Sequence, residues 1–178
     1  MSLTRPTPAD LEKAIRNIPD FPKPGIQFKD ITPVLADARL FSGSIDLLTE
    51  RFRPGDVDAV VGIDARGFIF AAAAAVKLQA GLVSVRKQGK LPYRTHEQQY
   101  NLEYGTATVA VHVDALKPGS RVLLIDDLLA TGGTAAAAAA LVRRLEARIL
   151  EISFLIELQF LGGRQKLQDY PVRSLIVY

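Results

Sequence analysis

Two adjacent carboxylates, Asp126 and Asp127, lie just before a short run of hydroxyl and glycine residues, Thr131–Thr134. Four apolar residues precede the acids and are typical of a buried strand, and six alanines after Thr134 favour a helix. A helix N-terminus without bulky side chains attracts anions, and paired carboxylates beside it suit sugar hydroxyls or a hydrated Mg²⁺. The stretch therefore predicts a ligand site. The alternative is a simple turn with solvated acids and a threonine N-cap.

A second turn repeats this pattern. The apolar segment Asp58–Ile63 is followed by Asp64-Ala65-Arg66-Gly67, and then by aromatic residues and five alanines. Ligands of parallel sheets bind at the carboxyl ends of strands, so two such turns on neighbouring strands would bind two phosphate groups. Arg66 is then an anion ligand or, alternatively, a surface arginine. The alanines also have a packing explanation, because small side chains let a helix lie close to a sheet.

The least regular region is Arg86–Tyr104, which is polar and basic and includes Arg86, Lys87 and Lys90. A loop of this length is uncommon unless it is functional or mobile, and its positive charge favours an active-site lid that closes on an anion. A solvated hairpin is the alternative. Glu103, near the far end, is placed either to accept a proton or to pair with a base of the lid.

Phe28 lies between polar neighbours in a short extended segment, 26–31. It is either a stacking platform for an aromatic ligand or a side chain that fills the core.

The remaining pattern predicts the elements that position these residues. We expect helices over 7–18 and 38–52, after Gly67, from Thr134 to about Ala147, and briefly after Leu161. We expect strands over 58–63, 81–85, 105–112, 122–125, 149–158 and 172–177. This alternation predicts an α/β fold: a doubly wound, mostly parallel sheet flanked by helices, with an antiparallel lid hairpin. We expect one domain over 1–178, with a mobile lid at 86–104.

Composition limits the possible functions. The 178 residues are 48% apolar with a net charge of +3, which indicates a globular, mildly basic protein with room for a polyanionic ligand. The absence of cysteine excludes disulfides and cysteine zinc sites, and two distant histidines make no zinc motif. We expect no signal peptide and no membrane-spanning helix, since no apolar run approaches about 20 residues. A cytoplasmic protein is the resulting prediction.

Several common enzyme motifs are missing. The sequence has no GxxxxGK[ST], no GxGxxG after its first strand and no GxSxG. These absences argue against a P-loop nucleotide hydrolase, a nicotinamide-binding domain and an α/β-hydrolase.

The stretch 122–134, apolar residues followed by DDxxATGGT, resembles the phosphoribosyl-diphosphate (PRPP) motif of type I phosphoribosyltransferases. Four further segments resemble the adenine phosphoribosyltransferase family, occur in that family's order and together cover nearly the whole chain. They are DFPKPGIQFKDITPVL at 20–35, GIDARGFIF at 62–70, RKQGKLPY with YNLEYGT at 86–106, and FLIELQFLGGRQKL at 154–167.

The resemblance implies the conversion of adenine and PRPP to AMP and diphosphate, with Mg²⁺ carried on PRPP and no direct protein ligand to the metal. It implies that Asp126 and Asp127 hold the ribose hydroxyls, and that Glu103 meets N7 of the purine when the lid closes. The implied ligands of the 5-phosphate are Ala130, Thr131, Gly132, Gly133 and Thr134. Those of the diphosphate are Ala65, Arg66, Arg86, Lys87 and Lys90. Those of adenine are Gln27, Phe28, Arg66 and Leu158, with 1–35 covering the base.

Four positions depart from the family pattern without touching the motifs: Ala71, Ala107, Ala110 and Glu146. Two alternatives stay open. One is a xanthine or hypoxanthine-guanine phosphoribosyltransferase, against which the 20–35 segment argues. The other is a PRPP-sensing regulator that binds nucleic acid, against which the short segment before Phe21 and the lack of a basic helix argue. The resemblance also implies a homodimer, with no membrane or nucleic-acid partner.

Overall fold

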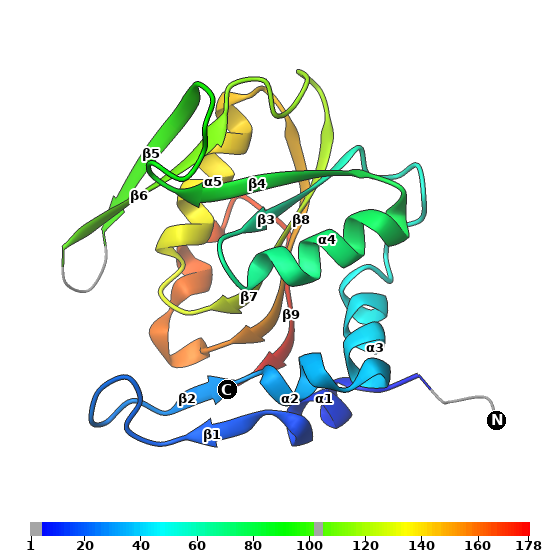
Figure 1. Cartoon of the computed structure of the whole chain (residues 1–178), viewed down its shortest axis with the longest axis vertical. Helices are drawn as coiled ribbons and strands as arrows, with labels where there is room; N and C mark the ends of the chain where they lie inside the picture. Colours follow the sequence, from blue (N-terminus) through cyan, green and yellow to red (C-terminus); the bar gives the residue numbers. More distant parts are fainter. Residues whose placement is uncertain (1–4, 102–104) are drawn as a thin grey trace. The chain divides into compact units, whose positions relative to one another are not determined.

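The computed structural model describes residues 5–101 and 105–178. The chain forms two compact units, Met1–Leu48 and Thr49–Tyr178, which are described separately below (Figure 1). The expectation of one domain over 1–178 stays a prediction.

The first unit contains a small antiparallel ribbon and three helices. Helix α1 (Pro8–Ala14) begins at a capping box in which Thr7 and Asp10 bond each other's backbone N–H groups. Strand β1 (Arg16–Ile18) pairs with β2 (Phe28–Asp30), and helices α2 (Thr32–Ala36) and α3 (Ala38–Leu48) follow.

Two helix predictions in this unit are too long. The helix expected to reach about Ile18 ends at Ala14, because Ile15 is extended and the next three residues pair with β2. An ion pair of 2.7 Å between Arg16 and Asp30 joins the two strands. The helix expected over 38–52 ends at Leu48.

The second unit is built on a sheet in which the described residues form seven strands in the order β5-β6-β4-β3-β7-β8-β9. The strands are β3 (Ala59–Ile63), β4 (Gly81–Lys87), β5 (Thr95–Asn101), β6 (Thr106–His112), β7 (Arg121–Leu129), β8 (Arg148–Glu157) and β9 (Val172–Val177). Strands β4, β3, β7, β8 and β9 run parallel to one another, whereas β6 is antiparallel to both β4 and β5. The predicted fold class, a mostly parallel sheet with an antiparallel hairpin, is confirmed.

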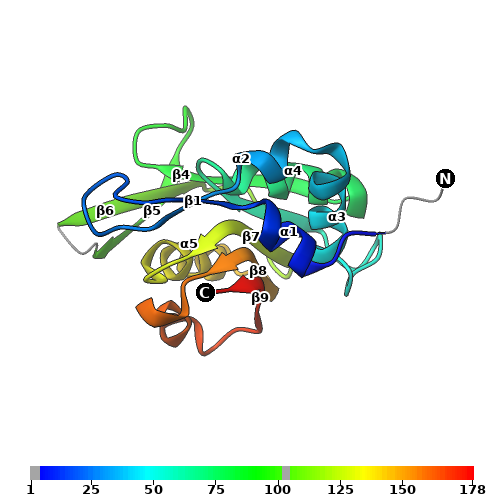
Figure 2. The ribbon, with the colours of Figure 1, turned by 90° about the horizontal axis from the view of Figure 1, so that it is seen from below.

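Helices α4 (Gly67–Leu78) and α5 (Gly133–Arg144) cover opposite faces of this sheet (Figure 2). Gly62 faces α4, and a Cβ added there would lie 2.6 Å from the Cβ of Ala71. The alternate residues Val61 and Ile63 pack instead in the core that contains the alanines of α5. Ala71 is fully buried, so its methyl, one of the departures from the family pattern, is accommodated by the glycine opposite.

Three predictions in the second unit are corrected. The region Arg86–Tyr104 is more regular than expected, because β4 continues to Lys87 and Thr95–Asn101 forms β5, an edge strand paired with β6. Strand β7 does not stop before the acids but runs on to Leu129. The short helix expected after Leu161 consists of two 3-10 turns, η1 (Gln159–Leu161) and η2 (Gly163–Leu167).

Across the part of the chain that the structure describes, no helix has both the length and the apolar character needed to cross a membrane.

Candidate functional site

The two glycine-containing turns meet at one edge of the sheet. Strand β3 is the parallel neighbour of β7, with Gly62 opposite Ile125, so both turns leave the sheet at its carboxyl edge. The turn after β3 approaches the acid pair of β7 closely, since a Cβ on Gly67 would lie 2.5 Å from Oδ1 of Asp126. The prediction that the turns follow neighbouring strands is confirmed.

The segment 130–134 comprises the loop Ala130–Gly132, between β7 and α5, and the first two residues of α5, Gly133 and Thr134. It lines a cavity of about 70 Å³ together with Asp126 and the residues that flank the loop. Gly132 takes a left-handed conformation (φ 76°) and is the N-cap of α5; no side chain of the described residues caps the helix. The interpretation of this turn as a threonine N-cap is therefore wrong, and the first backbone N–H groups of α5 are available to an anion.

The carboxylates of the two acids meet different surroundings. Asp127 is buried and pairs with Arg66, whose Nε lies 2.8 Å from Oδ2 of Asp127. Asp126 is half-buried, and its Oδ1 accepts a hydrogen bond of 2.9 Å from the backbone N–H of Asp127. Burial, and then the neighbouring charge of Asp127, raise the pKa of Asp126 well above its ordinary value. Burial also raises the pKa of Asp127, against the opposing charge of Arg66.

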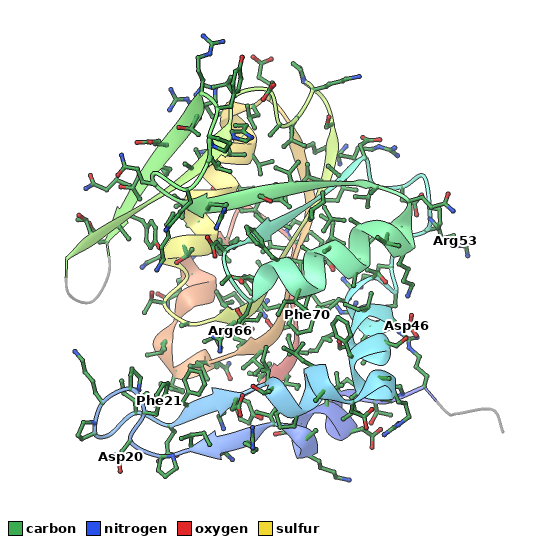
Figure 3. All side chains as sticks on the ribbon, in the orientation of Figure 1. Asp20, Phe21, Asp46, Arg53, Arg66 and Phe70 are labelled. Atoms are coloured by element: carbon green, nitrogen blue, oxygen red, sulfur yellow. The ribbon has the colours of Figure 1, made fainter. Side chains whose placement is uncertain are left out.

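Arg66 is therefore an internal partner of the acid pair and not a simple surface arginine. It lies at the N-cap of α4, as Figure 3 shows, and its side chain is 38% exposed. The guanidinium thus balances part of the negative charge at this edge, and part of the Arg66 side chain remains exposed to solvent.

A third contact ties the lid region to the same edge. Nε of Arg86 lies 3.1 Å from Oδ2 of Asp64, and its Nη1 donates to the carbonyl of Lys90 at 3.2 Å. The guanidinium also lies 5.9 Å from the centre of the Phe68 ring. Lys87 and Lys90 are exposed.

The role of Asp64 as the partner of Arg86 was missed by the sequence interpretation. The pairing register of β3 and β4 would have identified this contact. Ile63 is opposite Val85, so the next residues along the two parallel strands, Asp64 and Arg86, are neighbours.

The predicted base-binding residues are divided between the two units. Gln27 is exposed and Phe28 is half-buried in the first unit, where the Phe28 ring meets Phe21 edge-on at 5.1 Å. Figure 3 shows Phe21 beside Asp20 in the segment that joins β1 to β2. Leu158 follows β8 in the second unit, and its N–H donates to the carbonyl of Leu129. Glu103 lies outside the described residues, so its role stays a prediction.

The acid pair also bears on Mg²⁺. This cation is usually held by one or two carboxylates plus substrate phosphates, and the acid pair at the carboxyl edge fits a metal that arrives with a phosphorylated substrate. Within 5–101 and 105–178, no group of three or more acidic or histidine side chains is placed to hold a metal ion.

Comparison with known proteins agrees with this geometry. Residues 31–175 match the family described as phosphoribosyl transferase domain. The chain is 57% identical to an adenine phosphoribosyltransferase of Acidothermus cellulolyticus, over 95% of this chain and 98% of that protein.

Solved structures agree in fold as well. An adenine phosphoribosyltransferase of Thermoanaerobacter pseudethanolicus superposes with a TM-score of 0.92 at 49% identity, covering 97% of this chain and 100% of that one. The Saccharomyces cerevisiae enzyme, solved with adenine and an imino-altritol bisphosphate, gives a TM-score of 0.89 at 42% identity over 94% and 97% of the two chains. The chain belongs to the phosphoribosyltransferase family, and within it to the adenine phosphoribosyltransferases.

Proposed function

We propose that this chain transfers the phosphoribosyl group of PRPP to N9 of adenine, which gives AMP and diphosphate and serves purine salvage. The observation that carries the proposal is the carboxyl edge of β3 and β7, where two glycine-containing turns flank the acid pair. Such an edge suits a sugar that bears phosphate at both ends. The identity of 57% to an adenine phosphoribosyltransferase favours adenine over other purines.

In this proposal the end of β7 and the segment after it bind the ribose and the 5-phosphate of PRPP. The backbone N–H groups and hydroxyls of Ala130–Thr134 bind the 5-phosphate in the cavity that they line. Asp126 and Asp127 accept hydrogen bonds from the ribose hydroxyls, which supply donors to the buried Asp127 and the half-buried Asp126.

The turn after β3 and the lid bind the diphosphate. Ala65 and Arg66 contact it from the turn, and Arg86, Lys87 and Lys90 contact it from the lid, 86–104. Departure of diphosphate leaves an oxocarbenium-like sugar, so cationic groups around the leaving group lower the barrier. Mg²⁺ carried on PRPP supplies further positive charge to the leaving diphosphate. Closure of the lid excludes water, which would otherwise attack the same carbon.

Adenine is held by apolar stacking and by one carboxylate. Phe28 and Leu158 are the proposed apolar partners of the base, and backbone groups near Gln27 and Arg66 are its proposed polar partners. Glu103 meets N7 when the lid closes and accepts the proton that adenine must lose. We also propose a homodimer in the cytoplasm; sedimentation velocity that gives one species of about 19 kDa, the mass of a single chain, would contradict the dimer.

The deciding experiment measures AMP formed from adenine, PRPP and Mg²⁺, with hypoxanthine, guanine and xanthine in parallel. We expect AMP with adenine and little nucleotide with the other bases. A larger rate with any other base, or no product with adenine, would contradict the proposal.

The substitution Glu103→Gln tests the proton acceptor. It keeps the size of the side chain but removes the base, so kcat should fall by about 100-fold or more, while calorimetric PRPP affinity stays within about twofold. An equal loss of turnover and affinity, or no loss of turnover, would assign Glu103 another role.

A further inference from the structure

The motif FLGGRQ at 160–165 has no part in the proposed chemistry, yet its second glycine, Gly163, touches the loop that does. A Cβ on Gly163 would lie 2.1 Å from the carbonyl oxygen of Ala130 and 2.8 Å from the backbone nitrogen of Gly132. A Cβ on Gly132 would lie 2.3 Å from the carbonyl oxygen of Gly163. Real side chains do not tolerate such distances, so two backbones, far apart in sequence, pack together without any side chain between them.

The segment that carries Gly163 is anchored to the sheet. Arg164 pairs with Glu157 at the end of β8: its Nε donates at 3.0 Å, and its Nη2 makes a second, shorter bond. Nη1 of Arg164 donates to the carbonyl of Val172, and Ser174 donates to Glu157 at 2.6 Å. Glu157 is 4% exposed and pairs in register with Leu129, the last residue of β7. The position of Gly163 is thereby fixed to β9 and to the end of β8, which lies in register with the end of β7.

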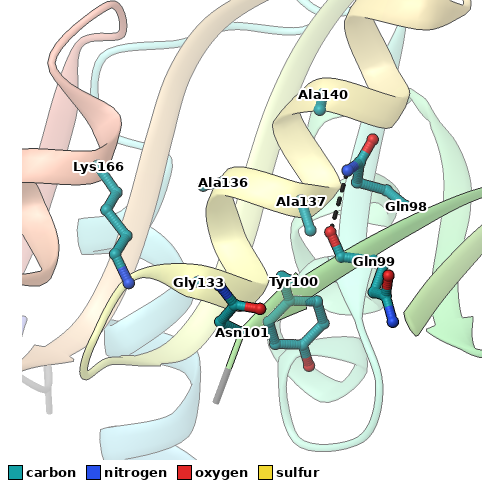
Figure 4. Close-up of a pocket in the computed structure, with 9 residues that line it drawn as sticks. All are labelled: Gln98, Gln99, Tyr100, Asn101, Gly133, Ala136, Ala137, Ala140 and Lys166. Atoms are coloured by element: carbon teal, nitrogen blue, oxygen red, sulfur yellow. Dashed lines mark hydrogen bonds between the residues drawn. The ribbon is translucent and has the colours of Figure 1, made fainter. Parts of the chain in front are cut away.

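The opposite side of the loop meets β5. A Cβ on Gly133 would lie 3.1 Å from Cδ2 of Tyr100, and Figure 4 shows the two residues side by side. Gly132 contacts the backbone of Gly163, and Gly133 contacts the ring of Tyr100. This backbone therefore cannot shift without displacing a neighbour.

We propose that Gly163 is a positioning residue for PRPP: its backbone holds Ala130–Gly132 in the conformation that presents N–H groups to the 5-phosphate. The inference rests on the proposed function, in which this loop binds that phosphate. It adds a requirement from outside the PRPP motif, namely a glycine held in place by the pair of Arg164 and Glu157. A displacement of about 1 Å can lower the rate of a reaction by about 100-fold, so a shift of this size in the N–H groups of the loop should weaken PRPP binding strongly.

The test compares Gly163→Ala with Gly81→Ala. At Gly81 an added Cβ meets only an ordinary contact, 3.6 Å from the carbonyl oxygen of Asp58. We expect Gly163→Ala to raise the KM for PRPP and the calorimetric Kd for PRPP by about 10- to 100-fold. The KM for adenine and kcat at saturating PRPP should stay within about twofold, and Gly81→Ala should change none of these values.

A second variant decides the matter if Gly163→Ala does not fold, as judged by circular dichroism. Arg164→Lys keeps the charge but loses the two-nitrogen fork that grips Glu157, so it should raise the KM for PRPP by about 3- to 10-fold with the KM for adenine unchanged. Unchanged PRPP affinity in the folded variant, or an equal loss for both substrates, would overturn the inference. An unmodified protein that makes no AMP would instead overturn the proposed function, so the two failures are distinguishable.

Discussion

Asp126 and Asp127 are neighbours on one strand, yet their carboxylates have different partners. Asp127 is paired with Arg66, whereas Asp126 accepts a hydrogen bond from the backbone N–H of Asp127, and its pKa is raised well above the ordinary value. A charged Asp126 is therefore costly in the free protein, and a ligand that donates hydrogen bonds to it relieves that cost.

The first prediction concerns stability against pH. Because folding raises the pKa of Asp126, the folded state binds more protons than the unfolded state between the two pKa values, so the free energy of unfolding falls as the pH rises through that window. Asp126→Asn removes this loss and should raise the free energy of unfolding by about 1 kcal/mol at pH 7, with the gain vanishing below about pH 4. Urea denaturation at both pH values measures it.

The matched control is Asp127→Asn, which removes the carboxylate charge that pairs with Nε of Arg66. It should give no gain at pH 7, although both variants should lose affinity for PRPP. An Asp126→Asn protein that is destabilised at pH 7 would contradict the assignment of that cost to Asp126.

The second prediction concerns Arg86. Its guanidinium bonds Asp64 and the carbonyl of Lys90 together, so it both carries charge and orders the start of the lid region. Arg86→Ala should raise the KM for PRPP and the inhibition constant of diphosphate by about 10- to 100-fold, since hydrogen bonds to charged groups contribute about 1.5–3 kcal/mol. For Arg86→Lys, both constants should lie between those of the unmodified protein and those of Arg86→Ala. Steady-state kinetics measure this, and a larger change in the KM for adenine would contradict it.

Among the elements, α4 owes its closeness to the sheet to Gly62. The fully buried Ala71 occupies the space that a side chain at position 62 would need. This contact holds the helix whose N-cap is Arg66, so the packing of small residues bears directly on the anion turn.

The third prediction follows from that contact. Gly62→Ala should lower the free energy of unfolding by about 1–3 kcal/mol because it overpacks a filled interface. Adding Ala71→Gly makes room and should recover most of the loss, as measured by thermal or urea unfolding. Additive losses in the double variant would show that the two positions do not share one space.

The elements also show what local patterns predict and what they miss. A continuous apolar run predicted β3 within a residue, because a strand buried on both faces has a strong local signal. Strand β5, THEQQYN, was predicted as irregular because it is polar on both faces, and only its pairing with β6 makes it a strand. The same limit explains the contact of Gly132 with Gly163, since nothing near either glycine specifies a partner 31 residues away.

At the scale of the whole molecule, the net charge of +3 and the cationic residues of the lid attract a polyanion but not a neutral base. The fourth prediction is therefore that kcat/KM for PRPP falls by about tenfold between 0.05 and 0.5 M potassium chloride, whereas kcat/KM for adenine at saturating PRPP changes by less than about twofold. Equal salt dependence for both substrates would argue against electrostatic attraction of PRPP.

The adjacency of β3 and β7 has a geometric consequence. Paired strands are held about 4.8 Å apart by their backbone hydrogen bonds, and each of these two strands is followed by a glycine-containing turn at the same edge. The spacing of the strands therefore sets the distance between the two turns, independently of the side chains in them. In the proposed function, substitutions within the turns change the affinity for each phosphate group. The separation of the two phosphate groups that can bind at once is set by the backbone.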